Sequence, residues 1–301
     1  MKRITEEHNP ASRDLDLRSS EEILGLINTE DRGIPGAVRE VIPMVARAVD
    51  ETTARLRAGG RVFYIGAGTS GRLGVLDAAE IPPTFGVDGE LFQAVIAGGF
   101  DACHCSTEAS EDDALQGERD LRARGCRAED VVVGIAASGE TPYTLGALTW
   151  ARSSGALTIA LCCNPDAALL HAADIAITPV VGPEVIAGST RMKAGTAQKL
   201  VLNMFSTAVM VRLGHVYSHW MVNVQMKSAK LKARGLRILM EATGMPEAEC
   251  RKTIASSGDD LRVALVMLTS GTGPQRARAS LQAHGWNLRE TLQDVTGGGS
   301  S

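Results

Sequence analysis

The sequence is poor in aromatic residues, which make up 4% of its 301 residues, and it contains no block of lysines and arginines. Its formal net charge is −4. A nucleic-acid-binding protein needs a basic surface, and usually aromatic side chains on which bases stack. Because the chain has neither feature, we exclude nucleic acid as a partner.

Long apolar runs are also absent from the sequence. No window reaches the roughly 18 apolar residues of a membrane span, and the N-terminal run MKRITEEHNPASRDLD has no apolar core of a secretory signal. The six cysteines follow no zinc-site spacing: Cys103 and Cys105 flank His104, which ordinary packing explains better than a metal. We expect a cytoplasmic protein with reduced thiols, no membrane partner and no metal.

The chain does contain a repeated alternation of strand-like and helix-like segments. Valines at helical spacing predict one long helix over residues 35–58. Short apolar runs separated by helix-length segments predict strands at 61–66, 91–99, 130–138, 156–163 and 174–182. Buried strands that alternate with helices predict an α/β fold, a parallel sheet in a three-layer αβα arrangement. Ligands of such sheets bind at the carboxyl ends of the strands.

The pattern changes in the last third of the chain. Residues 189–214 read as one long buried helix, and after it the strand signal stops. From about residue 241, short helical patterns separated by glycines predict a small C-terminal helical bundle. Its composition suits packing or interaction better than catalysis. We therefore predict two domains, residues 1–240 and 241–301.

A glycine-rich loop follows the first predicted strand. Gly66, Gly68 and Gly71 have the spacing G-x-G-x-x-G that is typical of a dinucleotide site. Such a site also needs an acidic residue at the end of the second strand, which binds the ribose. That strand ends in the run 97–99, Ala-Gly-Gly, so we reject a dinucleotide.

Hydroxyl side chains and a glycine gather in three loops that follow strands. These candidate ligands are Thr69 and Ser70 in the glycine loop, Ser138, Gly139 and Thr141 in the run ASGETP, and Ser189 and Thr190 before the long helix. Hydroxyls and backbone N–H groups at a helix N-terminus bind a phosphate dianion. Ordinary N-capping explains any one of these loops. All three at one edge of a sheet predict a sugar-phosphate site.

With these loops in view, the chain resembles the SIS (sugar isomerase) domain family. The matching runs are GAGTSGRLGVLDAAEIPPTFG (66–86), VVVGIAASGETPY (131–143) and GSTRMKAGTAQKLVLNM (188–204), and weaker agreement covers nearly the whole chain. The resemblance implies a flavodoxin-like domain that binds a sugar phosphate and assembles as a homodimer.

Within that family, the runs are most similar to those of lyases that remove D-lactate from C3 of N-acetylmuramic acid 6-phosphate. The implied reaction uses no cofactor, neither metal nor nucleotide. Once the sugar ring opens, the C1 aldehyde acidifies the C2 hydrogen, and the C3 oxygen becomes a leaving group. Elimination followed by addition of water needs one base and one acid, which two carboxylates supply.

The resemblance also implies which residues act. Glu80 is the implied acid, at the end of a short helix before Pro82 and Pro83, where a helix C-terminus and partial burial favour the protonated form. Glu111 is the implied base, and Glu108 on the same helical face is the alternative. The contacts to phosphate and sugar carry over to Thr69, Ser70, Ser138, Gly139, Thr141, Ser189 and Thr190. Lys193 is either a further positive charge near the phosphate or a helix-surface lysine.

The sequence differs from that of relatives at two places, and two alternative functions stay open. Ile81 stands where many relatives have cysteine, and Lys227-Ser228 replaces a Thr-Asn pair, so we assign that segment no role. One alternative function is a sugar-phosphate-binding regulator of the glucokinase-regulator type, without catalysis. The other is an aldose-ketose isomerase. Retention of both Glu80 and Glu111 favours the lyase over the regulator.

Overall fold

The computed structural model describes residues 3–105, 111–223, 226 and 228–297. The chain forms two compact units. The sheet unit comprises Met1–Ala79 and Gly89–Val209, and the helical unit comprises Glu80–Asp88 and Met210–Ser301. The division into domains predicted at residue 240 stays a prediction.

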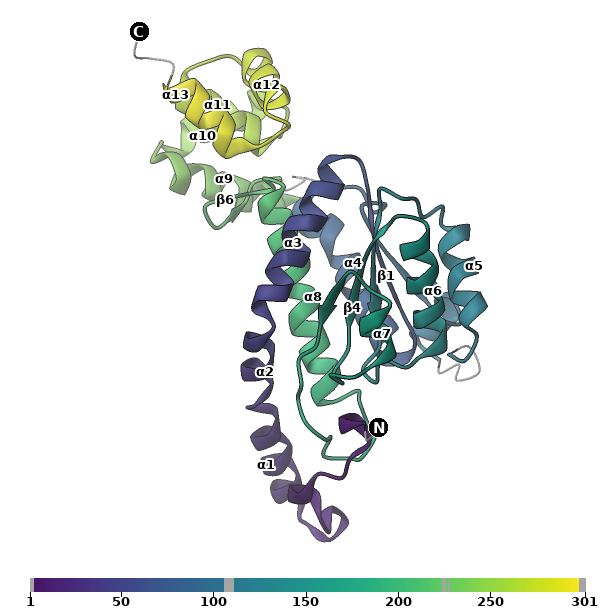
Figure 1. Ribbon diagram of the computed structural model, residues 1–301. Helices are drawn as coiled ribbons and strands as arrows, with labels where there is room; N and C mark the ends of the chain where they lie inside the picture. Colours follow the sequence, from purple (N-terminus) through teal and green to yellow (C-terminus); the bar gives the residue numbers. More distant parts are fainter. Residues whose placement is uncertain (1–2, 106–110, 224–225, 227, 298–301) are drawn as a thin grey trace. The chain divides into compact units, whose positions relative to one another are not determined.

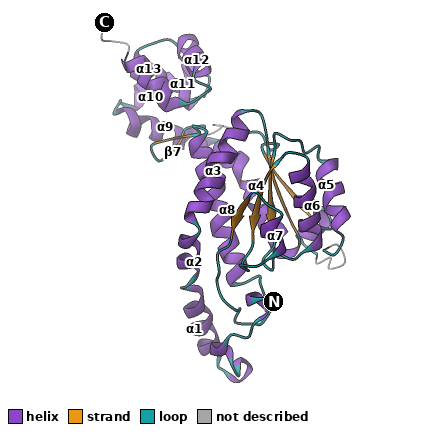
Figure 2. Cartoon of the chain, in the orientation of Figure 1, coloured by secondary structure: helices purple, strands orange, loops and turns teal. Residues whose placement is uncertain are grey.

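The sheet unit is built on five parallel strands in the order β2-β1-β3-β4-β5. The strands are β1 (Val62–Gly66), β2 (Phe92–Ile96), β3 (Val131–Ile135), β4 (Leu157–Leu161) and β5 (Ile175–Ile177). Each strand lies inside one of the predicted runs. The order is that of flavodoxin-like folds, so the predicted α/β architecture is confirmed (Figure 2).

Helices cover both faces of this sheet (Figure 1). One side carries α5 (Ala114–Ala123), α6 (Pro142–Ser153) and α7 (Ala168–His171), and the other carries α3 (Ile42–Arg57), α4 (Gly68–Phe85) and α8 (Lys193–Arg212). Helices α1 (Ser20–Asp31) and α2 (Ile34–Glu40) precede them. Short 3-10 helices are η1 (Ile4–Glu6), η2 (Pro10–Ser12), η3 (Leu15–Leu17) and η4 (Phe100–Cys103).

Alternate side chains of β1 enter two different packing layers. Phe63 belongs to the core shared with Tyr143 of α6. Tyr64 faces the other layer, where its hydroxyl donates to Asp77 of α4 at 2.9 Å and its ring lies 6.5 Å from that of Phe205 in α8. Because both faces are covered, all five residues of β1 are buried.

Two predicted helices have different bounds in the structure. The helix predicted over residues 35–58 is broken at Val41 into α2 and α3, and each part has a proline in its first turn. Pro43 has no N–H to continue a preceding helix, but it fits the start of a new one. The helix predicted from residue 189 begins only at Lys193.

The helical unit has its own apolar core, and the predicted C-terminal bundle is confirmed. Its helices are α9 (Ala229–Thr243), α10 (Glu247–Ser257), α11 (Leu261–Ser270), α12 (Pro274–Ala283) and α13 (Leu288–Gly297). The strand signal does not stop entirely, because β6 (Val216–Tyr217) and β7 (Trp220–Met221) form a two-residue antiparallel pair. This pair is too short to show alternation in the sequence.

The glycine loop allows α4 to approach the sheet closely. A Cβ atom on Gly71 would lie 2.7 Å from the carbonyl oxygen of Gly66 and 2.7 Å from Cγ1 of Ile96. A real Cβ does not fit at these distances. The third glycine of the fingerprint is therefore explained by packing of helix against strand, without any nucleotide.

We predict that Gly71→Ala destabilises the protein by about 1–3 kcal/mol, because the added methyl group overpacks the contact between α4 and β1. Urea unfolding followed by circular dichroism measures the change. Gly25→Ala is the matched control, since a Cβ there has nothing within 4 Å and Gly25 lies inside α1. We expect the control to gain up to about 1 kcal/mol of stability. Equal midpoints for Gly71→Ala and the wild type would contradict the packing argument.

Candidate functional site

Two of the predicted loops are brought together by the first turns of α4 and α8. A Cβ on Gly195 would lie 3.5 Å from Cγ2 of Thr69, so the two turns approach each other closely. The Gly195 N–H donates to the carbonyl oxygen of Thr190 at 2.9 Å, which fixes the turn that precedes α8. Thr69 and Thr190 thus lie on adjoining turns.

The ASGETP loop packs against the first turn of α8 through small residues. Ala137 packs with Cys163 and with Ala194, the second residue of α8, in one buried cluster. The Cys163 N–H donates to the Ala137 carbonyl oxygen at 2.9 Å. The structure therefore brings the three predicted loops together at the carboxyl edge of the sheet.

Glu111 lies between two helix N-termini. A Cβ on Gly68, the first residue of α4, would be 3.1 Å from Oε1 of Glu111, so the carboxylate sits against that turn. The carbonyl oxygen of Glu111 accepts a hydrogen bond of 3.0 Å from the N–H of Tyr143, in the first turn of α6. Glycine suits position 68, because its φ of 51° lies in the left-handed region that other residues rarely adopt.

The ASGETP loop is shaped by Gly139. Its φ is 70°, and a Cβ there would lie 2.3 Å from Cβ of Ala167. Ser138 Oγ accepts the N–H of Glu140 at 3.2 Å. Thr141 is the N-cap residue of α6, but its side chain makes no capping hydrogen bond. Ordinary N-capping therefore does not explain the hydroxyl of Thr141.

Ser70 is buried in the first turn of α4. Its hydroxyl donates to Oε1 of Gln198, in α8, at 3.0 Å. Gln198 is fully buried, and Ser70 is 7% exposed. The hydroxyl hydrogen of Ser70 is thus already used within the chain.

Ser189 and Thr190 are half-buried and lie in a turn before α8. The sequence had predicted that both belong to a helix over residues 189–214. The helix begins at Lys193 because Glu184 occupies its N-terminus. The Glu184 carboxylate accepts the N–H of Lys193 and that of Ala194, both at 2.9 Å. A carboxylate at this position satisfies two of the free N–H groups of the helix and stabilises its positive end.

Lys193 is buried, so the prediction of a helix-surface lysine is wrong. Its Nζ lies 2.7 Å from Oε2 of Glu30, at the end of α1. The hydrogen bond from Lys193 lowers the pKa of Glu30. Since Lys193 is paired in this way, its charge is neutralised by Glu30 before any phosphate arrives.

The N-terminal arm, residues 3–12, fastens these loops. Asn164 donates to the Ser138 carbonyl oxygen at 2.9 Å and to Thr5 Oγ1 at 3.0 Å. Asn9 donates to Glu30 Oε2 at 2.7 Å and to the Pro183 carbonyl oxygen at 3.3 Å. The arm is therefore part of the frame of the site.

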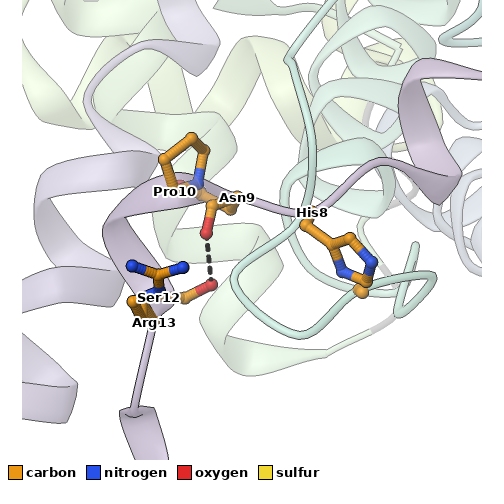
Figure 3. A pocket seen from close by; sticks show the side chains of 6 residues that line it. His8, Asn9, Pro10, Ser12 and Arg13 are labelled. Carbon is orange, nitrogen blue, oxygen red and sulfur yellow. Dashed lines mark hydrogen bonds between the residues drawn. The ribbon is translucent and has the colours of Figure 1, made fainter.

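A cavity of about 570 Å³ lies along the arm, and no pattern in the sequence indicates it. Figure 3 shows His8, Ser12 and Arg13 among its lining side chains, with the Ser12 hydroxyl donating to the Asn9 carbonyl oxygen at 2.9 Å. Ala187, just before the Ser189-Thr190 turn, also lines it.

Glu80 is not joined to this group of residues. It is exposed, and it is the first residue of the helical unit. In α4 it stands ten residues beyond Ser70, which is about 15 Å along a helix axis. The expectations of partial burial and of a helix end at Glu80 are wrong, because α4 continues through Pro82 and Pro83 to Phe85. Glu108 and Lys227 lie outside the described residues.

Cys103 and Cys105 lie beside Arg72 of α4. Cys103 is half-buried and Cys105 is exposed, and the carbonyl oxygens of both accept hydrogen bonds from Arg72. In the described parts of the chain, no three His, Cys, Asp or Glu side chains are grouped closely enough to hold a metal ion. Among the same residues, no helix has the length and apolar character that crossing a membrane requires.

Sequence reasoning missed the polar residues that hold the loops in place. Three of them are each at least 95% buried: Asn164, Glu184 and Gln198. An isolated polar residue in an apolar stretch of sequence does not show which groups its side chain will hydrogen-bond in the folded protein. The only available signal was a glutamine in the middle of the apolar run KAGTAQKLVLNMF. A buried amide in such a run predicts a hydrogen-bond partner without saying where it lies.

Comparison with known proteins confirms the resemblance to SIS domains. Residues 44–152 match the model of the glucokinase regulatory protein N-terminal SIS domain, and residues 115–208 match the SIS domain model. Among solved structures, a phosphoheptose isomerase from Neisseria gonorrhoeae is 20% identical, with a TM-score of 0.48 over 63% of this chain and 98% of that chain.

Curated relatives are similar over almost the whole chain. A protein of Brucella anthropi named N-acetylmuramic acid 6-phosphate etherase is 50% identical over 289 residues, which is 96% of this chain and 94% of the relative. One of Vibrio cholerae, named N-acetylmuramic acid 6-phosphate etherase 2, is 48% identical over 97% of this chain and 95% of the relative.

Proposed function

Because the chain belongs to the N-acetylmuramic acid 6-phosphate etherase family, we propose that it cleaves the D-lactyl ether of N-acetylmuramic acid 6-phosphate. The products are N-acetylglucosamine 6-phosphate and D-lactate, so the enzyme is a carbon-oxygen lyase of cell-wall amino-sugar recycling. The observation that carries the proposal is the position of the Glu111 carboxylate against the first turn of α4, while the Glu111 backbone carbonyl accepts the Tyr143 N–H of α6.

The phosphate is held, in this proposal, by the three loops. The first turns of α4 and α6 offer backbone N–H groups and the positive ends of two helices, which favour a dianion. The hydroxyls of Thr69, Thr141, Ser189 and Thr190 and the loops around Ser70, Ser138 and Gly139 surround the same place. The uncapped side chain of Thr141 supports this assignment, because its hydroxyl is not used at the helix end.

Glu111 acts as the base. With the sugar in its open form, the carboxylate takes the proton from C2, and a double bond forms between C2 and C3 as the bond from C3 to the lactyl oxygen breaks. The positive end of the α4 dipole favours the ionised form of a carboxylate beside it, and only that form accepts a proton. The closeness of Glu111 to Gly68 supports this role.

Glu80 acts as the acid, and the copy that meets the sugar is that of a second chain, because Glu80 stands ten residues beyond Ser70 in α4 and so about 15 Å away along the helix axis. It gives its proton to the departing lactyl oxygen, and the resulting carboxylate then takes a proton from the water that adds to C3. Addition of water returns a proton to C2, so the net reaction is hydrolysis of the ether. No cofactor enters these steps, since each is a proton transfer or a change of carbon-oxygen bonding that two carboxylates serve.

The active assembly is a homodimer in this proposal. Leu76 of α4 is 49% exposed and Met204 of α8 is 37% exposed. They flank the hydrogen bond of 2.7 Å from Asn203 to Asp77, which joins the two helices side by side. Leu76 precedes Glu80 by one helical turn, so a second chain on this face would also cover Glu80. Burial of a carboxyl group favours the protonated form that an acid needs.

A cytoplasmic location belongs to the same proposal. All six cysteines are free thiols, and Cys105 is exposed. Unpaired exposed thiols persist in a reducing compartment. The substrate is a phosphorylated sugar, which is also the chemistry expected inside the cell.

A regulator without catalysis is not favoured. The match to the regulator model covers residues 44–152, whereas the etherase relatives align with almost the entire chain. A regulator would bind the sugar phosphate tightly and release no D-lactate.

We predict that Glu80→Gln and Glu111→Gln each reduce kcat about 10²- to 10⁴-fold, because an amide neither gives nor takes the required proton. An enzymatic assay of D-lactate measures turnover, and calorimetry with N-acetylglucosamine 6-phosphate checks that the site is intact. Glu118→Gln is the matched control, since Glu118 pairs with Arg122 on the surface of α5. If Glu111→Gln turns over like the wild type while Glu108→Gln does not, Glu108 is the base.

We also predict that light scattering of the purified protein gives the mass of two chains, about twice 31.7 kDa. Leu76→Asp should shift this mass towards that of one chain, because a charge on the exposed face of α4 opposes burial against a second copy. Leu24→Asp, at a leucine of α1 that is 65% exposed, is the control. A wild-type mass of one chain contradicts the dimer.

A further inference from the structure

Gln198 carries a buried amide nitrogen that has no hydrogen-bond partner. Among the described residues, four buried side-chain polar atoms are in this position: Thr52 Oγ1, Thr144 Oγ1, Gln198 Nε2 and Arg262 Nε. Gln198 is fully buried in α8, and its other amide atom, Oε1, accepts the hydrogen bond from Ser70. The unpartnered N–H groups therefore lie at the first turn of α4.

An unpartnered buried amide is costly, because the group has lost its hydrogen bonds to water and gained none in return. A methionine or leucine would fill the same space in this apolar helix without that cost. Buried polar groups without partners occur where a ligand or water completes the set. The Gln198 amide thus points to an acceptor that is absent from the chain itself.

The surroundings of the amide define the chemistry of that acceptor. The first N–H groups of α4 have no partner within the helix, and together with the helix dipole they favour an anion. Ser70 cannot add its hydroxyl hydrogen to such an anion, since that hydrogen is given to Gln198. Besides the free N–H groups of α4, the amide of Gln198 offers a side-chain donor next to Ser70.

We propose that the side-chain amide of Gln198 is a ligand of the substrate phosphate and donates a hydrogen bond to one of its oxygens. Ser70 is then a positioning residue, whose hydroxyl holds the Gln198 amide by its oxygen so that the nitrogen faces the phosphate. The inference rests on the proposed sugar-phosphate site and changes which side chain supplies a donor there.

The test compares Gln198→Met with the wild type. Methionine keeps the length of the side chain and removes the donor. We expect affinity for N-acetylglucosamine 6-phosphate, measured by calorimetry, to fall about tenfold to a hundredfold, as for loss of a hydrogen bond to a charged group. Inhibition by inorganic phosphate should weaken by a similar factor. Inhibition by N-acetylglucosamine, which has no phosphate, should stay the same.

Thermal unfolding separates a ligand from a structural residue. Removing an unpartnered amide relieves a burial cost, so Gln198→Met should unfold no earlier than the wild type. Thr52→Val is the matched control, because it removes another fully buried polar atom without a partner, in α3. The control should keep the wild-type affinity for N-acetylglucosamine 6-phosphate.

Two outcomes overturn the inference. The first is a Gln198→Met variant that binds N-acetylglucosamine 6-phosphate as tightly as the wild type. The second is a Ser70→Ala variant that loses more affinity than Gln198→Met, since the hydroxyl would then be the ligand and the amide its support. A wild-type protein that binds the sugar phosphate but releases no D-lactate contradicts the proposed lyase alone, because the binding measurements still decide the role of Gln198.

Discussion

Close packing of the first turn of α8 against the first turn of α4 is the contact on which the site depends. Gly195 has no side chain, which lets Thr69 approach, and the hydrogen bond from Ser70 to Gln198 spans the two turns. The ASGETP loop reaches the same place through Ala137 and Ala194. Larger side chains at these small residues would separate loops that come from distant parts of the chain. The proposed anion site therefore depends on helix packing as much as on the hydroxyl side chains.

The loops are held by buried polar residues that are themselves fully engaged. Glu184 fills the N-terminus of α8, Asn164 fastens the Ser138 loop to the arm, and the pair of Lys193 with Glu30 joins α8 to α1. Breaking a buried pair leaves an uncompensated charge, so such contacts fix one arrangement of the loops. A rigid frame of this kind suits a reaction that needs a base held over C2 of a flexible open-chain sugar.

The sequence allowed the sheet, the loops and the helical bundle to be predicted, because each has a local signature. Apolar runs marked the strands, and glycines marked the ends of α9, α10 and α11, where Gly244, Gly258 and Gly271 adopt positive φ. The course of α4 beyond Glu80 was not predictable, since its end depends on a distant residue. Asn223 donates to the carbonyl oxygens of Phe85 and Gly86, at 2.7 Å and 3.2 Å, more than 130 positions along the chain. The hydrogen bond from the Ser70 hydroxyl to Gln198 was not predictable for the same reason, because its two residues are far apart in the sequence.

The central claim is that the ether is cleaved by elimination and addition of water at C3, and not by attack of water on the lactyl carbon. The most direct measurement is a reaction in water labelled with oxygen-18, followed by carbon NMR of N-acetylglucosamine 6-phosphate and mass spectrometry of D-lactate. The account predicts that the label enters the C3 hydroxyl of the sugar, seen as an isotope shift of the C3 signal, and that D-lactate stays unlabelled. Label in the hydroxyl of the released lactate, with none at C3, would contradict it.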